Sequence, residues 1–286
     1  MKTVAAKAEV SSKWGRTGHY IAIYIITLLM MIPLIWMVLL SFRTNNIILN
    51  NPFSFAGSWT FENYMRAWNT LPVGSLYKNT FIIVICSIFF EVLFTFMSSY
   101  ALARLVFKSE RLRNFIYTNL LFGLAIPPFI LLFPVYRMTI EMNILNTHLS
   151  LILPYIATAI SFNTLVFFGF FRGVPKEIEE AGIIDGTGLY ALCRHVVFPI
   201  TIPVVTTVFI FNVLFMWNEY PFAVTLLNDK TMNTIALGVS QFKGQFSIDY
   251  GGTIAASTLF IIPQLIFFAF FQKYIIDGMT AGAVKG

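Results

Sequence analysis

The sequence predicts an all-α polytopic membrane protein with six transmembrane helices. Three observations lead to this fold class. Hydrophobic residues make up 57% of the 286 residues and charged residues only 11%, whereas a soluble domain carries about 25% charged residues. Six apolar runs approach the roughly 20 residues that a helix needs to cross a bilayer. The basic residues are also distributed unevenly among the segments that connect these runs.

The six runs predict helices of different regularity. The first is too long for the apolar core of a signal peptide and is followed by no small-residue cleavage pattern, so we expect it to remain as a span. The third contains Pro127, Pro128 and Pro134, so we expect it to be kinked or broken. The fifth is the shortest and ends in polar residues. The predicted spans cover residues 20–41, 80–102, 115–135, 149–171, 200–217 and 254–271.

Lysine and arginine indicate the orientation of the chain. With the N-terminus in the cytoplasm, the inner segments carry thirteen of the 19 basic residues and the outer segments six. Cytoplasmic loops carry the excess of these residues in membrane proteins, so both termini are expected inside. The expected organisation is a cytoplasmic segment 1–19, a first helix 20–41, an extracytoplasmic loop 42–78, a five-helix core 79–272 and a cytoplasmic tail 273–286.

The inner connector 173–199 reads GVPKEIEEAGIIDGTGLYALCRHVVFP. Pro175 suits the first position of a helix, and Gly186 suits the left-handed position that ends one. Thr187 then caps a second helix, which is expected to run up to Pro199. Negative charge near a helix start is favourable. The carboxylates of the connector are Glu177, Glu179, Glu180 and Asp185.

One face of the first connector helix is expected to carry Ile178, Ala181, Gly182 and Asp185. Ala181 and Gly182 are small enough to let another protein approach the backbone closely, with Glu180 and Asp185 as fixed charges beside that contact. The alternative is an amphipathic hairpin on the membrane surface. Such a helix usually carries basic residues, whereas this acidic one would repel anionic lipid, so a protein partner is favoured.

The connector also contains a motif at fixed spacing. Its positions are Glu180, Ala181, Gly182, Asp185, Gly186 and, downstream, Pro199. This pattern resembles the EAA loop, E-A-A-x-x-D-G with a later proline, of membrane subunits of binding-protein-dependent ABC importers. The resemblance implies a coupling helix that docks in a cleft of a partner ATPase. Gly182 replaces the second alanine of the pattern, and Cys193 stands where an aromatic residue is common.

Four further stretches resemble the smaller membrane subunit of maltose-type sugar importers: FENY at 61–64, the pair Asn79–Thr80, YALARLVF at 100–107 and GMTAGAVKG at 278–286. The resemblance thus extends over nearly the whole chain. It implies that the C-terminal tail lies against the ATPase dimer. The tail residues concerned are Gly282, Ala283, Val284, Lys285 and Gly286.

Several polar residues are candidates for a translocation path. Glu91 is the only charged residue deep within a predicted span, and such a carboxylate either serves function or packs as a partnered structural group; both readings stay open. Asn212, Asn218 and Glu219 are expected to cluster next to Trp217, because oligosaccharide sites combine amides and carboxylates with aromatic platforms. The alternative is that they only line the path, since a second permease can hold most sugar contacts.

Other chemistries find no support in the sequence. His19, His148 and His195 lack metal-ligand spacing, and no Walker A or nucleophile-elbow motif occurs. The net charge of +6 comes without a basic patch interleaved with aromatics, which argues against nucleic acid. Cys86 and Cys193 are expected at different depths and unpaired. We therefore expect no enzyme and no cofactor on this chain, with ATP and Mg bound by the partner ATPase that the resemblance implies.

The leading hypothesis is a permease subunit of an ATP-driven importer in a bacterial cytoplasmic membrane, with a carbohydrate, specifically an oligosaccharide, as the expected substrate. The resemblance implies a second homologous permease, a homodimeric ATPase and an extracytoplasmic sugar-binding protein as partners. Two alternatives remain: a secondary transporter coupled to protons through Glu91, and an ABC permease for a non-sugar solute. The secondary transporter predicts inverted repeats and further charged relays, which the sequence does not contain.

Overall fold

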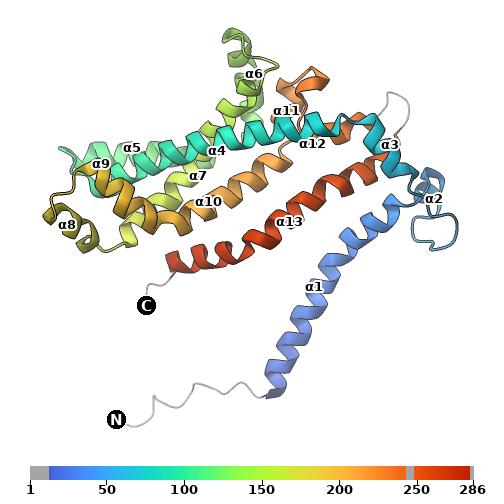
Figure 1. Cartoon of the computed structure of the whole chain (residues 1–286), viewed down its shortest axis with the longest axis horizontal. Helices are drawn as coiled ribbons and strands as arrows, with labels where there is room; N and C mark the ends of the chain where they lie inside the picture. Colours follow the sequence, from blue (N-terminus) through green and yellow to red (C-terminus); the bar gives the residue numbers. More distant parts are fainter. Residues whose placement is uncertain (1–12, 243–247, 284–286) are drawn as a thin grey trace. The chain divides into compact units, whose positions relative to one another are not determined.

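The computed structural model describes residues 13–242 and 248–283 (Figure 1). All regular elements within these residues are helices, so the all-α prediction is confirmed. The contacts divide the chain into two units, each of which is considered by itself. The first unit comprises Met1–Thr70 and Phe242–Leu259, and the second comprises Leu71–Gln241 and Phe260–Gly286.

Five helices of the described part are long and apolar enough to cross a membrane. They match five of the six predicted spans, because hydropathy over about 20 residues is a strong signal for such helices. The five are α1 (Lys13–Ser41), α4 (Val73–Arg104), α7 (His148–Gly173), α13 (Tyr250–Ala283) and the stretch Leu189–Asn218, which includes α10 (Phe198–Asn218).

The remaining predicted span is broken, as its prolines lead us to expect. The helical segments Glu110–Ala125 and Pro128–Glu141 meet at 95°. Pro127 and Pro128 lack an N–H group, and the residue before Pro127, Ile126, adopts an extended conformation with φ −93° and ψ 114°. Counted as one span, the bent pair brings the total to six. Its elements are α5 (Glu110–Phe122), η1 (Gly123–Ala125), η2 (Pro128–Leu131) and α6 (Leu132–Glu141).

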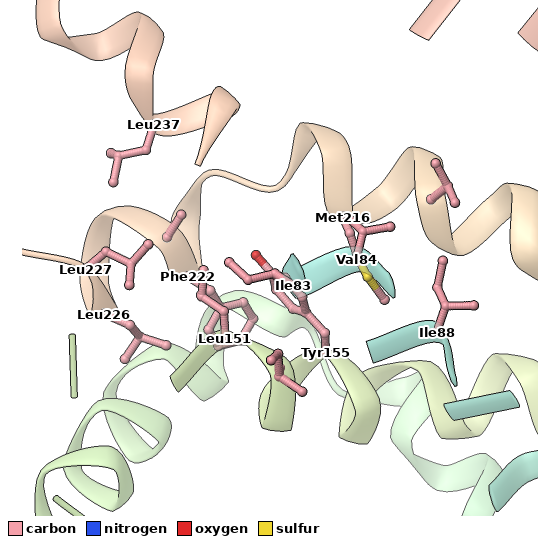
Figure 2. Packing of buried hydrophobic residues seen from close by; sticks show 13 residues of the cluster. Ile83, Val84, Ile88, Leu151, Tyr155, Met216, Phe222, Leu226, Leu227 and Leu237 are labelled. Atoms are coloured by element: carbon pink, nitrogen blue, oxygen red, sulfur yellow. The ribbon is translucent and has the colours of Figure 1, made fainter. Parts of the chain in front are cut away.

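Helices α4, α7 and α10 form the centre of the second unit, and α4 packs against α7 along their lengths. One apolar cluster joins these helices to α11 (Pro221–Leu226), and Figure 2 shows its side chains converging from the different helices. A second cluster lies where α4 ends. Its buried residues are Tyr100, Phe167, Phe171, Leu192, Val197, Val204 and Val208.

In the first unit, Arg43 organises the loop that follows α2 (Asn45–Asn50). Its guanidinium donates to the carbonyl oxygens of Ser54 (2.6 Å), Ala56 (2.5 Å), Gly57 (3.1 Å) and Ser58 (3.4 Å). The same group lies 4.3 Å from the centre of the Trp59 ring. A buried cation is thus satisfied by backbone oxygens and a ring face.

The FENY stretch supports this arrangement from α3 (Glu62–Thr70). The buried Asn63 amide donates to the carbonyls of Ser41 (2.8 Å) and Arg43 (2.7 Å). The Tyr64 and Ser41 hydroxyls are 2.6 Å apart. The first of these bonds satisfies the Ser41 carbonyl, which the end of α1 leaves unpaired, and the others hold the chain that follows α1.

Several helix boundaries differ from the prediction; α1 begins at Lys13 and α13 ends at Ala283, beyond the predicted 20 and 271. Helix α4 begins at Val73, not near residue 80, because the polar Tyr77–Asn79 stretch lowers hydropathy without breaking a helix. The second connector helix does not stop at Pro199. Helix α9 (Leu189–Leu192) passes through a π-helical turn, Cys193–Val197, directly into α10. Pro199 lies in the first turn of α10, where a missing N–H is tolerated, and the π turn absorbs the change in hydrogen-bond register.

Candidate functional site

The carboxylate-rich connector forms the short helix α8 (Glu177–Ile184). It begins at Glu177 and not at Pro175, a difference within the usual uncertainty of helix ends. It ends as predicted, with Gly186 in the left-handed region at φ +78°. The Gly186 N–H donates to the Ile183 carbonyl and the Thr187 N–H to the Gly182 carbonyl, both at 3.0 Å. This pair of bonds is a Schellman motif.

Thr187 therefore has a different role from the one predicted. It completes the end of α8, whereas Gly188 stands at the N-cap of α9 and no side chain caps that helix. The glycine of the EAA-like motif also differs from expectation. A Cβ at Gly182 would lie 2.7 Å from Cδ1 of Leu192, so its small size allows α8 to pack closely against this chain's own α9.

The connector presents an exposed apolar surface flanked by carboxylates. Ile184 is 85% exposed and Tyr190 76%, and Ile183 and Leu189 are exposed beside them. Glu180, Ala181 and Asp185 are also exposed. Helices α8 and α9 lie at the end of the second unit where α4 ends (Figure 1). A docking face on α8 follows from the sequence, whereas these large apolar side chains are not part of that prediction.

Glu179 is turned the opposite way, into the protein. Its carboxylate oxygen Oε1 lies 2.7 Å from Nε of Arg104, and these two side chains are only 10% and 6% exposed. The Tyr100 hydroxyl donates to Oε2 at 3.0 Å, and Arg104 also donates to the Val174 carbonyl at 2.7 Å. Sequence reasoning placed Glu179 among four similar carboxylates. The sequence feature that could have indicated a partner for Glu179 is Arg104, the basic residue in the last turn of α4 within YALAR.

Among the candidate path residues, Glu91 and Asn212 lie close together. Glu91 on α4 is 0% exposed, and its backbone carbonyl accepts from the Thr95 hydroxyl at 2.5 Å. Asn212 lies beside the carboxylate, although neither carboxylate oxygen has a well-formed hydrogen bond in the described chain. Asn212 donates instead to Oδ1 of Asn163 on α7 at 3.1 Å. Asn163 is thus a further buried polar residue of this group, which sequence reasoning missed.

Two hollows lie between α10 and the bent span. The first has a volume of about 510 Å³ and combines polar Thr158, Ser161 and Asn212 with several phenylalanines. The second, of about 280 Å³, includes Asn218 and Glu219. Both are lined by Pro128 and Phe215, so they adjoin. A Cβ at Gly123 would lie 2.3 Å from the Ser161 hydroxyl oxygen, which shows how closely the bent span approaches α7.

The expected cluster around Trp217 is not formed, because successive helical residues point in different directions. Trp217 is buried and lines an apolar cavity of about 450 Å³ between α4, α10 and α13. Its ring N–H donates to the Phe260 carbonyl at 3.3 Å. Asn218 is exposed and donates to the Leu214 carbonyl at 2.7 Å.

Glu219 has structural partners as well as a place beside the hollow. It accepts hydrogen bonds from the Tyr155 hydroxyl (2.6 Å) and from the backbone N–H groups of Phe222 (2.7 Å) and Ala223 (3.2 Å). Its carboxylate therefore caps the start of α11. Burial raises the pKa of Glu219, and the hydrogen bonds from these three partners oppose that shift.

The predicted tail contact falls mostly beyond the described structure. Gly282 and Ala283 are the last residues of α13, whereas Val284, Lys285 and Gly286 lie outside the described residues.

Comparison with known proteins shows which family this chain belongs to. Residues 96–281 match the family described as "Binding-protein-dependent transport system inner membrane component". The chain is 31% identical to the diacetylchitobiose uptake system permease protein NgcG of Streptomyces coelicolor, over 99% of this chain and 93% of that protein. It is also 31% identical to the melibiose/raffinose/stachyose import permease protein MelC of Bacillus subtilis, over 81% and 83% of the two chains.

A solved structure shares the fold. It is the crystal structure of a bacterial ABC transporter involved in the import of the acidic polysaccharide alginate. One of its chains superposes with a TM-score of 0.77, covering 93% of this chain and 98% of that one at 18% identity. The predicted ABC importer permease fold is thereby confirmed.

Proposed function

Because this chain belongs to the family of binding-protein-dependent transport system inner membrane components, we propose that it forms half of the path of an ATP-driven carbohydrate importer. The family makes it a multi-pass inner membrane protein and a transport subunit, not an enzyme. An importer of this kind works with an ATPase and a binding protein. The second, homologous permease, the homodimeric state of the ATPase and the carbohydrate substrate are parts of the proposal.

The observation that carries the coupling proposal is the exposed surface of α8 and α9. Large exposed apolar side chains beside carboxylates mark interaction sites in soluble regions of proteins. The motif carboxylates Glu180 and Asp185 lie beside Ile184 on this surface. We propose that it docks on the ATPase, with the tail residues 282–286 as a second contact.

The hollows along α10 support a carbohydrate substrate. Sugars offer hydroxyl groups at the ring edge and C–H groups on the ring face, so they suit sites that combine amide or hydroxyl groups with aromatic rings. Asn212, Thr158 and Ser161 supply the polar groups, and Phe162 and Phe211 supply the rings. The relatives named for diacetylchitobiose and for melibiose, raffinose and stachyose point to the same class.

The docking proposal and the distribution of basic residues require the same orientation. An ATPase acts in the cytoplasm, so α8 and both termini are placed on that side. Membership of this family argues against the alternative in which Glu91 couples uptake to protons, because importers of this family are driven by ATP. The alternative of a non-sugar solute is settled only by the choice of substrates in a transport assay.

Uptake by the complete complex in proteoliposomes tests the proposal. The panel is diacetylchitobiose, melibiose, raffinose and stachyose, with glycerol 3-phosphate as the non-sugar probe. We expect ATP-dependent uptake of at least one sugar that persists when an uncoupler collapses the proton gradient. Uptake of glycerol 3-phosphate alone would refute the carbohydrate assignment, and uptake abolished by the uncoupler at constant ATP would refute the ATP-driven mechanism.

A pair of variants on α8 tests docking directly. Glu180→Lys reverses an exposed charge of the motif, and Glu177→Lys makes the same change at an exposed position outside it. Glu180→Lys is expected to lose copurification with the ATPase and sugar uptake while membrane insertion stays normal. Glu177→Lys is expected to keep both. Normal copurification and uptake with Glu180→Lys would refute the docking assignment.

A further inference from the structure

Helix α8 is attached to the rest of the second unit through one buried side chain. Glu179 is its only buried residue among Glu177–Ile184. The other close approach is the packing of Gly182 against Leu192 of α9, and the large side chains Ile183 and Ile184 are exposed. A displacement of α8 therefore reaches α4 through the Glu179 contact, whereas α9 continues directly into α10.

The contact joins α8 to the end of α4. Tyr100 and Arg104 are four residues apart on α4, so their side chains lie on one face, and both bind the Glu179 carboxylate. Arg104 also donates to the Val174 carbonyl, in the turn between α7 and α8. The Tyr100 ring packs edge-on against Phe171 of α7, with centroids 5.5 Å apart. The carboxylate is thus fixed in position by a guanidinium and a phenol that are themselves held in place.

Stability alone gives a weak reason for this arrangement. A buried ion pair loses the hydration of two charges, and well-packed apolar residues often stabilise a protein as well or better. What the group provides is a link between helices: the Tyr100 hydroxyl donates to one carboxylate oxygen, and the Arg104 guanidinium pairs with the other while it binds the Val174 carbonyl.

Helix α4 is suited to transmit a displacement. It runs unbroken from Val73 to Arg104 without an internal proline, whereas α1, α7, α10 and α13 each contain one. Bends in long helices occur mainly at such prolines. The same helix carries Glu91, beside Asn212 of the hollow that runs along α10.

We propose that Arg104, Tyr100 and Glu179 form a joint that transmits the movement of α8 to α4 during transport. This rests on the proposed docking of α8 on an ATPase. The three are positioning residues: they touch neither ATP nor sugar, and they determine how far α4 follows α8. The YALAR stretch and Glu179, the residue directly before the EAA-like motif, are far apart in the sequence and form this joint together.

The test measures sugar uptake per ATP hydrolysed by the complete complex in proteoliposomes. The probe is the sugar of the four named above that gives the highest uptake. Glu179→Gln and Arg104→Gln are each expected to keep copurification with the ATPase but to lower this ratio about tenfold. Glu177→Gln, an exposed carboxylate of the same helix, is expected to leave it unchanged. The reversed pair Arg104→Glu with Glu179→Arg is expected to regain at least about threefold over either single reversal.

A purely structural role has a different signature. Poor folding lowers the amount of complex, so uptake and ATP hydrolysis fall in the same proportion and the ratio stays constant; that result would overturn the proposal. Tyr100→Phe removes one hydroxyl group and serves if the charge variants fail to assemble. It is expected to lower the ratio about threefold, and an unchanged ratio would also overturn the proposal.

Failure of the docking assignment is distinguishable from failure of the joint. If docking is wrong, Glu180→Lys retains the ATPase and uptake. If only the joint is wrong, Glu180→Lys remains defective and Glu179→Gln is fully coupled.

Discussion

Asn212 on α10 donates its amide hydrogen to Oδ1 of Asn163 on α7 across 3.1 Å. This bond joins two membrane helices through side chains that are both buried. Hydrogen bonds of this kind hold helices together where lipid provides no hydrophobic driving force. The same Asn212 borders the hollow beside the bent span, so its amide belongs both to the packing of the helices and to the surface of the proposed path.

Asn212→Leu is expected to weaken sugar uptake. Removing one hydrogen bond to a substrate costs about 1 kcal/mol, so the KM for uptake should rise roughly fivefold while the chain still inserts. Gln264→Leu is the matched control, because it removes a similar amide from the apolar cavity on the other side of α10. Equal KM values for the two variants would show that the hollow is not part of the path.

Gly186→Ala is expected to strain the backbone at the end of α8 and so to impair the coupling of α8 to the ATPase. At φ +78° a side chain is strained, and a residue other than glycine costs about 1–2 kcal/mol there. We expect uptake to fall roughly fivefold or more. The control is Gly188→Ala, where φ is −69° and the added Cβ meets no atom within 4 Å. If both variants transport equally well, the left-handed end of α8 has no role in coupling.

The orientation of the chain can be measured with single cysteines, after Cys86 and Cys193 are replaced by serine. Ile184→Cys, at a position of α8 that is 85% exposed, is expected to react with a membrane-impermeant maleimide only in inverted vesicles. Phe53→Cys, exposed in the loop after α2, is expected to react in intact cells. The reverse pattern would overturn the topology and, with it, the docking of α8 on a cytoplasmic ATPase.

Tyr155→Phe is expected to destabilise the protein. It removes the hydroxyl that donates to Glu219 at 2.6 Å in a buried site, and leaving a buried carboxylate short of a donor costs about 1–3 kcal/mol. The midpoint of thermal unfolding in detergent should fall by several degrees. Tyr220→Phe, at an exposed neighbouring position, should leave the midpoint unchanged. A midpoint unaffected by Tyr155→Phe would show that the cap on α11 is not needed for stability.

Local signals made much of the fold predictable. Apolar runs located the spans, Pro127 and Pro128 located the break in the third, and Gly186 located the end of α8. In each case the cause lies within a few residues of the effect. The start of α4 was missed because hydropathy reports contact with lipid, and a helix can extend beyond the membrane without it.

The candidate site was harder to predict because its contacts connect distant residues. Tyr100 and Glu179 are 79 positions apart, and Asn163 and Asn212 are 49 positions apart. Proximity in sequence was misleading at Trp217 and Glu219, which lie two residues apart at the end of α10 and line different hollows. A carboxylate-rich stretch cannot reveal by composition which of its members turns inward.

The arrangement around Arg43 has an entropic consequence for any protein that meets this loop. Four backbone carbonyls between Ser54 and Ser58 already share one guanidinium, and the Trp59 ring lies against it. Fixing the backbone of a residue costs about 1–2 kcal/mol of conformational entropy. In this loop that ordering occurs as the chain folds, so an incoming protein meets a surface already in its final shape and retains more of its binding free energy.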